Sequence, residues 1–374
     1  MTARATLRID LEKIAANTRR VVASLGGRHV VGVTKVTCGR PDVGRALLDG
    51  GAQALGESRL ENAERLRAAG ITAPIWLLRS PAPDLAADAV RLTDVSLESE
   101  LETVAALDRA AAEAGTTHGV IAMVDLGDLR EGMLPTDLPA FADAVERLAH
   151  VELAGIGVNL TCYGAVCPTT ANLGELAALA RQTERRLGRP LAFVSGGNSG
   201  SIALTVAGQM PAAITSLRVG ETILLGVDTL TREPTLGLHL DAFVVEAPVI
   251  ECKVKPSMPT GEIAQDAFGN RPSFVDRGER RRAICALGRQ DAPPEGLVPV
   301  DPRIEVLGAS SDHLILDVEA VEPPPRLGDP LAFVPGYGAT LQLSTSPYVA
   351  KQFVHSAGLT PRIVARSTPV TEEE

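Results

Sequence analysis

A lysine at the end of an apolar segment is the first residue in this sequence that could do chemistry. The segment VVGVTK ends at Lys35, and a bare ammonium group is costly to bury beside an apolar strand. The position becomes favourable if the amine forms an imine with a carbonyl compound, or if desolvation turns it into a base. A lysine that extends from a strand end to solvent is the structural alternative. The position alone does not decide between the two.

Two glycine-rich turns later in the chain indicate a phosphate ligand. One is SGGNSGS (195–201), which follows a strand-like segment, and the other is RVGE (218–221), which ends the next such segment. These turns expose backbone N–H groups, and a helix that starts near residue 199 adds the positive end of its dipole. Glycines that only form tight turns are the alternative. Two such turns together with Lys35 favour a small phosphorylated ligand with a carbonyl group, and pyridoxal 5′-phosphate (PLP) fits that description.

The elements that must position these groups alternate between strands and helices as far as Gly226. Eight apolar segments are expected to be strands: 29–35, 54–58, 74–79, 93–99, 119–125, 153–159, 191–197 and 216–221. Helix-length segments separate them, among them 40–50, 59–69, 99–114, 137–149 and 171–187. This pattern predicts an α/β fold, a (β/α)8 TIM-type barrel, with its site at the carboxyl ends of the strands. A doubly wound open sheet is the alternative, but no GxGxxG motif follows the first strand.

After Gly226 the sequence changes to the pattern of a β-rich domain. Residues 228–240 are expected to form a linker, and segments such as 243–254 alternate on a two-residue period. We therefore expect a C-terminal β-rich domain beside the barrel. The expected boundaries are a first strand over 1–9 that packs with the C-terminal domain, the PLP-binding barrel over 10–230, the β-rich domain over 238–366, and a disordered tail over 367–374.

Composition argues against several classes of protein. The net charge is −10, without a basic block, so a nucleic-acid partner is not expected. The five cysteines are scattered and form no CxxC pair, so neither a disulfide framework nor a metal site is predicted. The sequence starts without the apolar core of a secretory signal and has no run long enough for a membrane span. We expect a cytoplasmic protein without a membrane partner.

Taken together, these segments resemble the fold-type III PLP enzymes, the alanine racemase superfamily, across nearly the whole chain. The resemblance is to the ornithine/alanine racemase-like branch, and the segments that carry it are GVTKVTCG, VDLGDLREGML, GIGVNLTCYG, SGGNSGS, LRVGETILLG, KPSMPTGE, FGNRPSFVDRGERRRAICALGRQD and GASSDHLILD. It implies a homodimer with shared active sites that racemises an amino acid by moving the Cα proton between two acid/base groups. The implied substrate is ornithine or another basic amino acid, and next alanine or serine.

The resemblance also implies a role for each of several residues. Lys35 would carry the cofactor as an imine and act as the base on one face of the substrate. The phosphate would be held by the side chains or backbone of Asn198, Ser199, Gly220, Glu221 and Tyr348. Arg218 would face the pyridine nitrogen. Since a guanidinium keeps its proton, the ring would stay largely unprotonated and the carbanion too short-lived for transamination. Arg130 and Asn159 would lie on the substrate side.

The sequence departs from alanine racemases at positions that matter for the chemistry. Met123 stands where those enzymes have a modified lysine, and Asn159 stands where they have a histidine that stacks on the cofactor. No tyrosine aligns with the second base that their partner subunit supplies. The second base is therefore open, and Asp312 and His313, in GASSDH, rank first among the polar residues of the second domain. Asp128 is a candidate to bind a basic side chain.

Other functions remain open at this point. The segment LGESRLENAERL (55–66) resembles single-domain PLP-homeostasis proteins, which bind the cofactor without racemase turnover but lack a second domain. Another fold-type III PLP enzyme is a further alternative, although the metal-dependent members need a His/Cys pair near the C terminus that this sequence lacks. A Schiff-base aldolase acting on a sugar phosphate is a third, but the lysine lies on the first strand of the barrel.

Overall fold

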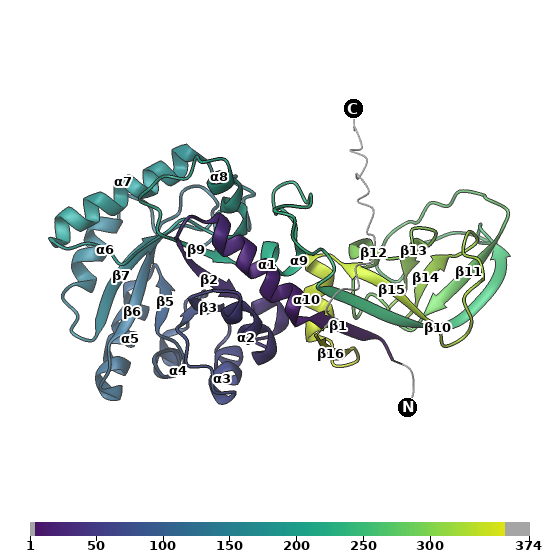
Figure 1. Ribbon diagram of the computed structural model, residues 1–374, viewed down its shortest axis with the longest axis horizontal. Helices are drawn as coiled ribbons and strands as arrows, with labels where there is room; N and C mark the ends of the chain where they lie inside the picture. The colour runs from purple at the N-terminus through teal and green to yellow at the C-terminus, as the bar shows by residue number, and fades with distance from the viewer. Residues whose placement is uncertain (1–3, 356–374) are drawn as a thin grey trace. The chain divides into compact units, whose positions relative to one another are not determined.

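The computed structural model describes residues 4–355 of the chain. These residues divide into two compact units, one formed by residues 11–239 and the other by residues 4–10 together with residues 240–355. Figure 1 labels the helices and strands of both. The predicted tail and the last residues of the predicted β-rich domain lie outside the described residues.

Eight parallel strands close into a barrel in the first unit, in the order of their sequence. They are β2 (His29–Val33), β3 (Ala54–Glu57), β4 (Ile75–Leu77), β5 (Val95–Glu98), β6 (His118–Met123), β7 (Val151–Gly157), β8 (Phe193–Ser195) and β9 (Ser216–Val219). Pairing of β2 with β9 completes the closure. Each of the eight predicted segments overlaps one of these strands, so the TIM-type barrel is confirmed and the open sheet is wrong.

Helices follow the strands and cover the outside of the barrel (Figure 1). They are α1 (Leu11–Ser24), α2 (Pro41–Asp49), α3 (Leu60–Ala68), α4 (Ala86–Leu92), α5 (Leu101–Ala114), α6 (Leu138–Val145), α7 (Thr170–Leu187), α8 (Ile202–Val206) and α9 (Glu221–Leu225). The longest, α7, begins with a capping box between Thr169 and Asn172 and ends at Gly188, whose φ of 67° is favourable for glycine. Local sequence thus sets both ends of this helix.

The barrel interior is filled by aromatic and aliphatic side chains. Trp76 stacks on His29 with ring centroids 5.7 Å apart and meets Phe193 edge-on at 4.9 Å. Val31 and Ile121 belong to the same buried cluster. Burial lowers the pKa of His29, which favours the neutral imidazole at this place. The barrel interior is therefore apolar, whereas polar side chains lie at the carboxyl ends of its strands.

The second unit is built on an eight-stranded sheet in which antiparallel pairs dominate. Its strands are β1 (Thr6–Asp10), β10 (Phe243–Pro256), β11 (Glu279–Cys285), β12 (Leu297–Pro299), β13 (Glu305–Ala309), β14 (Leu314–Asp317), β15 (Pro330–Pro335) and β16 (Ala350–Val354), with α10 (Tyr337–Thr345) between the last two. β1 pairs with β10 on one side and β16 on the other. The β-rich C-terminal domain is confirmed.

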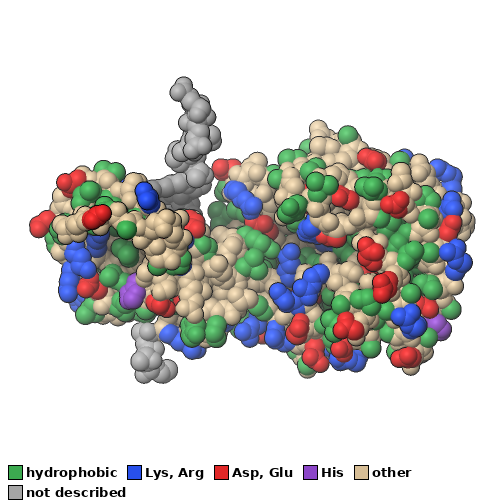
Figure 2. All heavy atoms as spheres, turned by 180° about the vertical axis from the view of Figure 1, so that it is seen from behind, with side chains coloured by type: hydrophobic (Ala, Val, Ile, Leu, Met, Phe, Trp, Pro, Cys, Tyr) green, Lys and Arg blue, Asp and Glu red, His purple; other side chains and the backbone are tan. Residues whose placement is uncertain are grey.

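The surface carries charges of both signs. Figure 2 shows acidic and basic side chains interspersed over the face of the molecule that it presents. Between residues 4 and 355, no helix combines the length and the apolar character that crossing a membrane requires.

Candidate active site

The carboxyl ends of four barrel strands bring together most of the residues predicted for the site. Lys35 opens a short 3-10 turn, Lys35–Thr37, just after β2. Asn159 lies two residues after β7, while Ser199 follows β8 and Arg218 lies in β9. Because parallel strands all point their carboxyl ends the same way, these side chains share one end of the barrel.

A buried carboxyl group lies beside Lys35. Glu57, the last residue of β3, is fully buried, and its Oε1 accepts a hydrogen bond of 2.5 Å from Thr34 Oγ1. Its Oε2 accepts from Asn62 Nδ2 at 3.0 Å and from the backbone N–H of Ser58 at 3.2 Å. Burial raises the pKa of Glu57, whereas these hydrogen bonds and the charge of Lys35 act in the opposite direction. Sequence reasoning missed this residue.

The loops after β8 and β9 are joined through Ser199. Its Oγ accepts from the backbone N–H groups of Gly220 and Thr222, both at 3.3 Å. Asn198 shapes the same loop, because its Oδ1 accepts from the N–H of Gly200 at 2.9 Å and its Nδ2 donates to the carbonyl of Leu160 at 2.7 Å. The predicted phosphate residues of the barrel therefore lie together.

Glycine is required on both sides of this junction. Gly197 has a φ of +99°, and a Cβ there would lie 3.0 Å from Ser201 Oγ. A Cβ on Gly220 would lie 3.0 Å from Val33 Cβ. The resulting cradle of backbone and a serine hydroxyl fits a phosphate group, whose oxygens accept hydrogen bonds from N–H and O–H donors.

Arg218 is a buried cation at the same end of the barrel. It is 4% exposed, and its guanidinium donates to Ser195 Oγ and, at 2.8 Å, to the carbonyl of Val158. Within residues 4–355 no carboxylate forms an ion pair with it. Burial lowers the pKa of Arg218 to about 10, so the side chain stays protonated at neutral pH. A buried cation whose hydrogen bonds all go to neutral acceptors suits a ligand that brings a further acceptor, such as a pyridine nitrogen.

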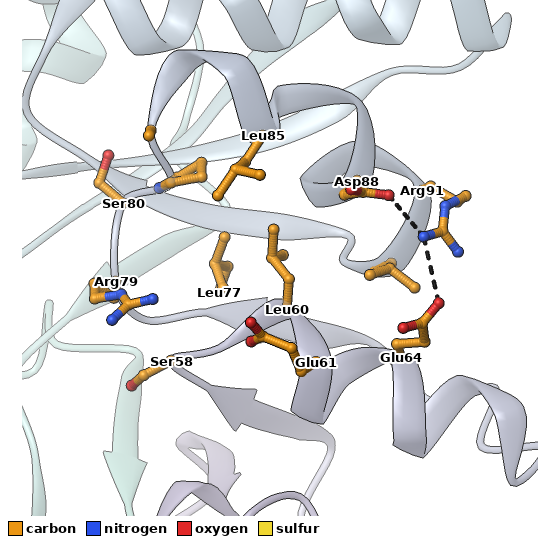
Figure 3. Close-up of a pocket in the computed structure, with 13 residues that line it drawn as sticks. Ser58, Leu60, Glu61, Glu64, Leu77, Arg79, Ser80, Leu85, Asp88 and Arg91 are labelled. Carbon is orange, nitrogen blue, oxygen red and sulfur yellow. Dashed lines mark hydrogen bonds and ion pairs between the residues drawn. The ribbon is translucent and has the colours of Figure 1, made fainter.

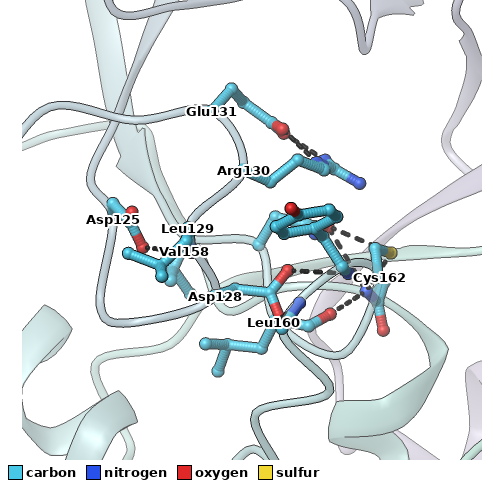
Figure 4. A network of polar contacts seen from close by, with 12 residues as sticks. Asp125, Asp128, Leu129, Arg130, Glu131, Val158, Leu160 and Cys162 are labelled. Carbon is cyan, nitrogen blue, oxygen red and sulfur yellow. Dashed lines mark hydrogen bonds and ion pairs between the residues drawn. The ribbon is translucent and has the colours of Figure 1, made fainter.

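Arg130 lies in the loop after β6 and has two polar neighbours. Its Nε and Nη2 donate to the two carboxylate oxygens of Glu131 (Figure 4). With its amide oxygen turned toward Arg130, Asn159 accepts from Nη1 at 3.0 Å and from Nη2 at 3.2 Å. Arg130 and Asn159 are thus brought together, as expected of residues on one side of a site.

Asp128 accepts hydrogen bonds from the backbone of a neighbouring loop. It is 1% exposed, and its carboxylate accepts from the N–H groups of Tyr163, Gly164 and Val166 at 3.1 to 3.4 Å. These bonds occupy its oxygens, which disfavours Asp128 as the group that binds a basic side chain. Both oxygens of Glu131 are likewise occupied, in its case by the guanidinium of Arg130.

Three predicted residues belong to the other unit. Asp312 and His313 are exposed on the turn between β13 and β14, where the N–H of Ser310 donates to the carbonyl of His313 at 3.0 Å. Tyr348 is 62% exposed just before β16. The structure places each within its own unit, and their roles stay predictions.

A separate cavity of about 380 Å³ lies on the outside of the barrel, between α3 and α4. Figure 3 shows Leu60, Leu77 and Leu85 around it, and Arg91 bridging Asp88 and Glu64 at its edge. None of the predicted site residues lines this cavity. The described part of the chain also contains no cluster of His, Cys, Asp and Glu side chains suited to a metal ion.

Comparison with known proteins gives consistent matches. Residues 9–227 match the family described as alanine racemase, N-terminal domain. An ornithine racemase from Acetoanaerobium sticklandii is 41% identical over 349 residues, which are 92% of this chain and 98% of that protein. A lysine racemase from Thermotoga maritima is 40% identical over 352 residues, which are 93% of this chain and 98% of that protein.

Solved structures share the fold over nearly the full length. An alanine racemase from a D-cycloserine-producing Streptomyces lavendulae superposes with a TM-score of 0.74 at 20% identity, covering 96% of this chain and 98% of that one. An alanine racemase from Bartonella henselae with covalently bound pyridoxal phosphate gives a TM-score of 0.72 at 20% identity, covering 94% and 100%.

Proposed function

This chain is an amino-acid racemase of the alanine racemase family, and we propose that it interconverts the L and D forms of a basic amino acid, ornithine or lysine, with PLP bound to Lys35. The observation that carries the proposal is the meeting of Lys35, the glycine-lined phosphate cradle and the buried Arg218 cation at one end of the barrel. The basic substrate is supported by the two full-length relatives, which are an ornithine racemase and a lysine racemase.

The cradle residues would hold the cofactor by its phosphate. Ser199 can donate its hydroxyl hydrogen to a phosphate oxygen while its oxygen accepts from two amides. The backbone of Gly220 and Glu221 begins α9 beside it. Arg218 would face the ring nitrogen without giving up its proton. Bound to a lysine, PLP delocalises the negative charge that remains when the Cα–H bond of an amino acid breaks.

The protein must then move a proton on both faces of Cα. Lys35 would take or return it on one face, since an amine can act as base and its ammonium form as acid. Asp312 and His313 are our candidates for the other face, supplied by the second subunit of a homodimer. Both are exposed on their turn, as a group that reaches a neighbouring subunit must be.

Arg130 would bind the substrate from the loop after β6. Its guanidinium is held by Glu131 and Asn159, so its direction is fixed before the substrate arrives. A planar guanidinium matches the two oxygens of an amino-acid carboxylate.

The proposal is tested by α-proton exchange in deuterated water, with L- and D-ornithine, lysine, alanine and serine as substrates. We expect deuterium to enter ornithine or lysine from either enantiomer, with the opposite enantiomer appearing. The Lys35→Ala variant should fold but retain no cofactor after borohydride reduction. Exchange without inversion would mean that the second acid/base group is missing. Bound PLP without any exchange would favour the PLP-binding protein without turnover.

A further inference from the structure

Glu57 lies directly behind the turn that carries Lys35. Val33 of β2 pairs with Gly56 of β3, so the next residues along the two strands, Thr34 and Glu57, also lie side by side. The backbone N–H of Thr34 donates to the carbonyl of Gly56 at 3.1 Å, and its hydroxyl donates to Glu57. The residue whose hydroxyl donates to this carboxyl group is therefore the one that directly precedes the lysine in the chain.

Burial, the largest effect, raises the pKa of Glu57, while its hydrogen bonds and the charge of Lys35 act to lower it and so favour the ionised form. The NH2 group of Asn62 and the backbone N–H of Ser58 are donors only. Both donate to the same carboxyl oxygen of Glu57, Oε2. Both bonds become stronger when the carboxyl group carries a negative charge. Lys35 is the cation that acts on this buried charge. The cation and the three donors therefore reduce the cost of a charge on this buried group.

The turn after Lys35 is also pressed against the helix that supplies one of these donors. Gly39, with a φ of +60°, approaches Asn62 on α3 so closely that a Cβ there would lie 2.7 Å from Asn62 Cβ. The backbone N–H of Cys38 donates to the carbonyl of Lys35 at 3.1 Å. The turn is thus held between β3 and α3, and the carboxyl group of Glu57 lies at the point where they meet.

We propose that Glu57 is a positioning residue for Lys35, which holds the lysine's turn through Thr34 and favours a positive charge on the lysine nitrogen. This inference rests on the proposed function, because it takes Lys35 to be the lysine that bonds to PLP. Its consequence for the reaction is direct. A lysine that returns a proton to Cα must hold that proton first, and a nearby carboxylate stabilises the proton-carrying form.

The chain offers a matched control in Glu98. This residue ends β5 as Glu57 ends β3, is 1% exposed, and accepts a hydrogen bond from Ser80 rather than from a neighbour of Lys35. Glu57→Gln and Glu98→Gln each remove one buried carboxyl group without changing its size. The visible absorption of the PLP-loaded protein is then titrated against pH, and the circular dichroism of each variant reports its fold.

We expect the titration midpoint of Glu57→Gln to fall by about one pH unit or more, because the proton on the lysine–cofactor linkage loses its carboxylate partner. Glu98→Gln should titrate as the wild type does. Racemisation by Glu57→Gln should lose at least about tenfold in kcat with a smaller change in KM. Glu57→Asp retains the charge, so its titration midpoint should lie close to that of the wild type.

Borohydride reduction followed by peptide mass spectrometry separates the two proposals. If the wild type carries no label on Lys35, the proposed function fails. If all variants are labelled there and Glu57→Gln titrates with the wild-type midpoint, the positioning role is overturned and the proposed function stands. Should Glu57→Gln not fold, Thr34→Val and Thr34→Ser replace it. We expect the valine variant to lose kcat and the serine variant to retain it, and equal rates in both would overturn the role.

Discussion

Replacing Arg218 by methionine should leave the apoprotein's stability almost unchanged but remove much of the stability that PLP adds. Burial lowers the pKa of this arginine to about 10, well below the usual value of a guanidinium, and each pKa unit corresponds to about 1.4 kcal/mol. The charged guanidinium therefore costs the folded apoprotein about 3 kcal/mol. Methionine removes this cost but leaves the Val158 carbonyl and the Ser195 hydroxyl without a donor. Each such buried group costs about 1–3 kcal/mol, so the two effects nearly cancel.

The loaded protein should behave differently. A hydrogen bond from a charged donor to the ring nitrogen contributes about 1.5–3 kcal/mol, and it exists only when PLP is bound. Thermal unfolding is measured with and without PLP for the wild type and Arg218→Met. We expect similar Tm values for the two apoproteins, and a rise on PLP binding that is several degrees smaller in the variant. Equal losses of Tm in both states would show that Arg218 only supports the barrel, and the reasoning about the ring nitrogen would be refuted.

Three further perturbations have expected outcomes. Burial raises the pKa of Glu98 to about 7, so its ionisation destabilises the folded protein progressively from pH 4.5 to about 7. Glu98→Gln should therefore raise the Tm, measured by circular dichroism, at about pH 8 but not at about pH 4. Burial lowers the pKa of His118 to about 4, so the stability of the folded protein falls as the pH drops from 6.5 towards 4. His118→Gln should make the Tm less dependent on pH in this range. An unchanged dependence would contradict the view that His118 is buried in its neutral form. Gly220→Ala places a Cβ 3.0 Å from Val33 and should weaken PLP binding about tenfold in a fluorescence titration while the barrel still folds.

The sequence was sufficient to predict the barrel because its strands are apolar on both faces. That same property hides which side of a strand each residue occupies. Lys35 and Arg218 stood out as polar residues at strand ends, whereas Glu57 also ends a strand but was passed over. Its role depends on Asn62, which comes from the following helix, and on the pairing of β2 with β3. Strand pairing of this kind is a tertiary feature that periodicity does not reveal.

The second unit was harder to predict in detail. β12 has three residues and β15 begins and ends with proline, so neither shows a clear two-residue period. The hydrogen bonds that occupy Asp128 come from the loop after the next strand, and no local pattern indicates them. By contrast, the glycines of the phosphate cradle could be recognised in the sequence, because they cluster in two short turns. The structure shows that a Cβ at Gly197 or Gly220 would be crowded by its neighbours.

The pairing of β1 has a consequence for how the protein is made. As the chain leaves the ribosome, Thr6–Asp10 emerges long before its partners β10 and β16, which begin at Phe243 and Ala350. The barrel's strands are all synthesised in between, so the barrel can close while β1 still lacks both neighbours. An unpaired strand is a site for association with other chains during that interval. A chain that ends before β10 leaves both edges of β1 without a neighbouring strand. We expect such truncated products to aggregate rather than to persist as a free barrel.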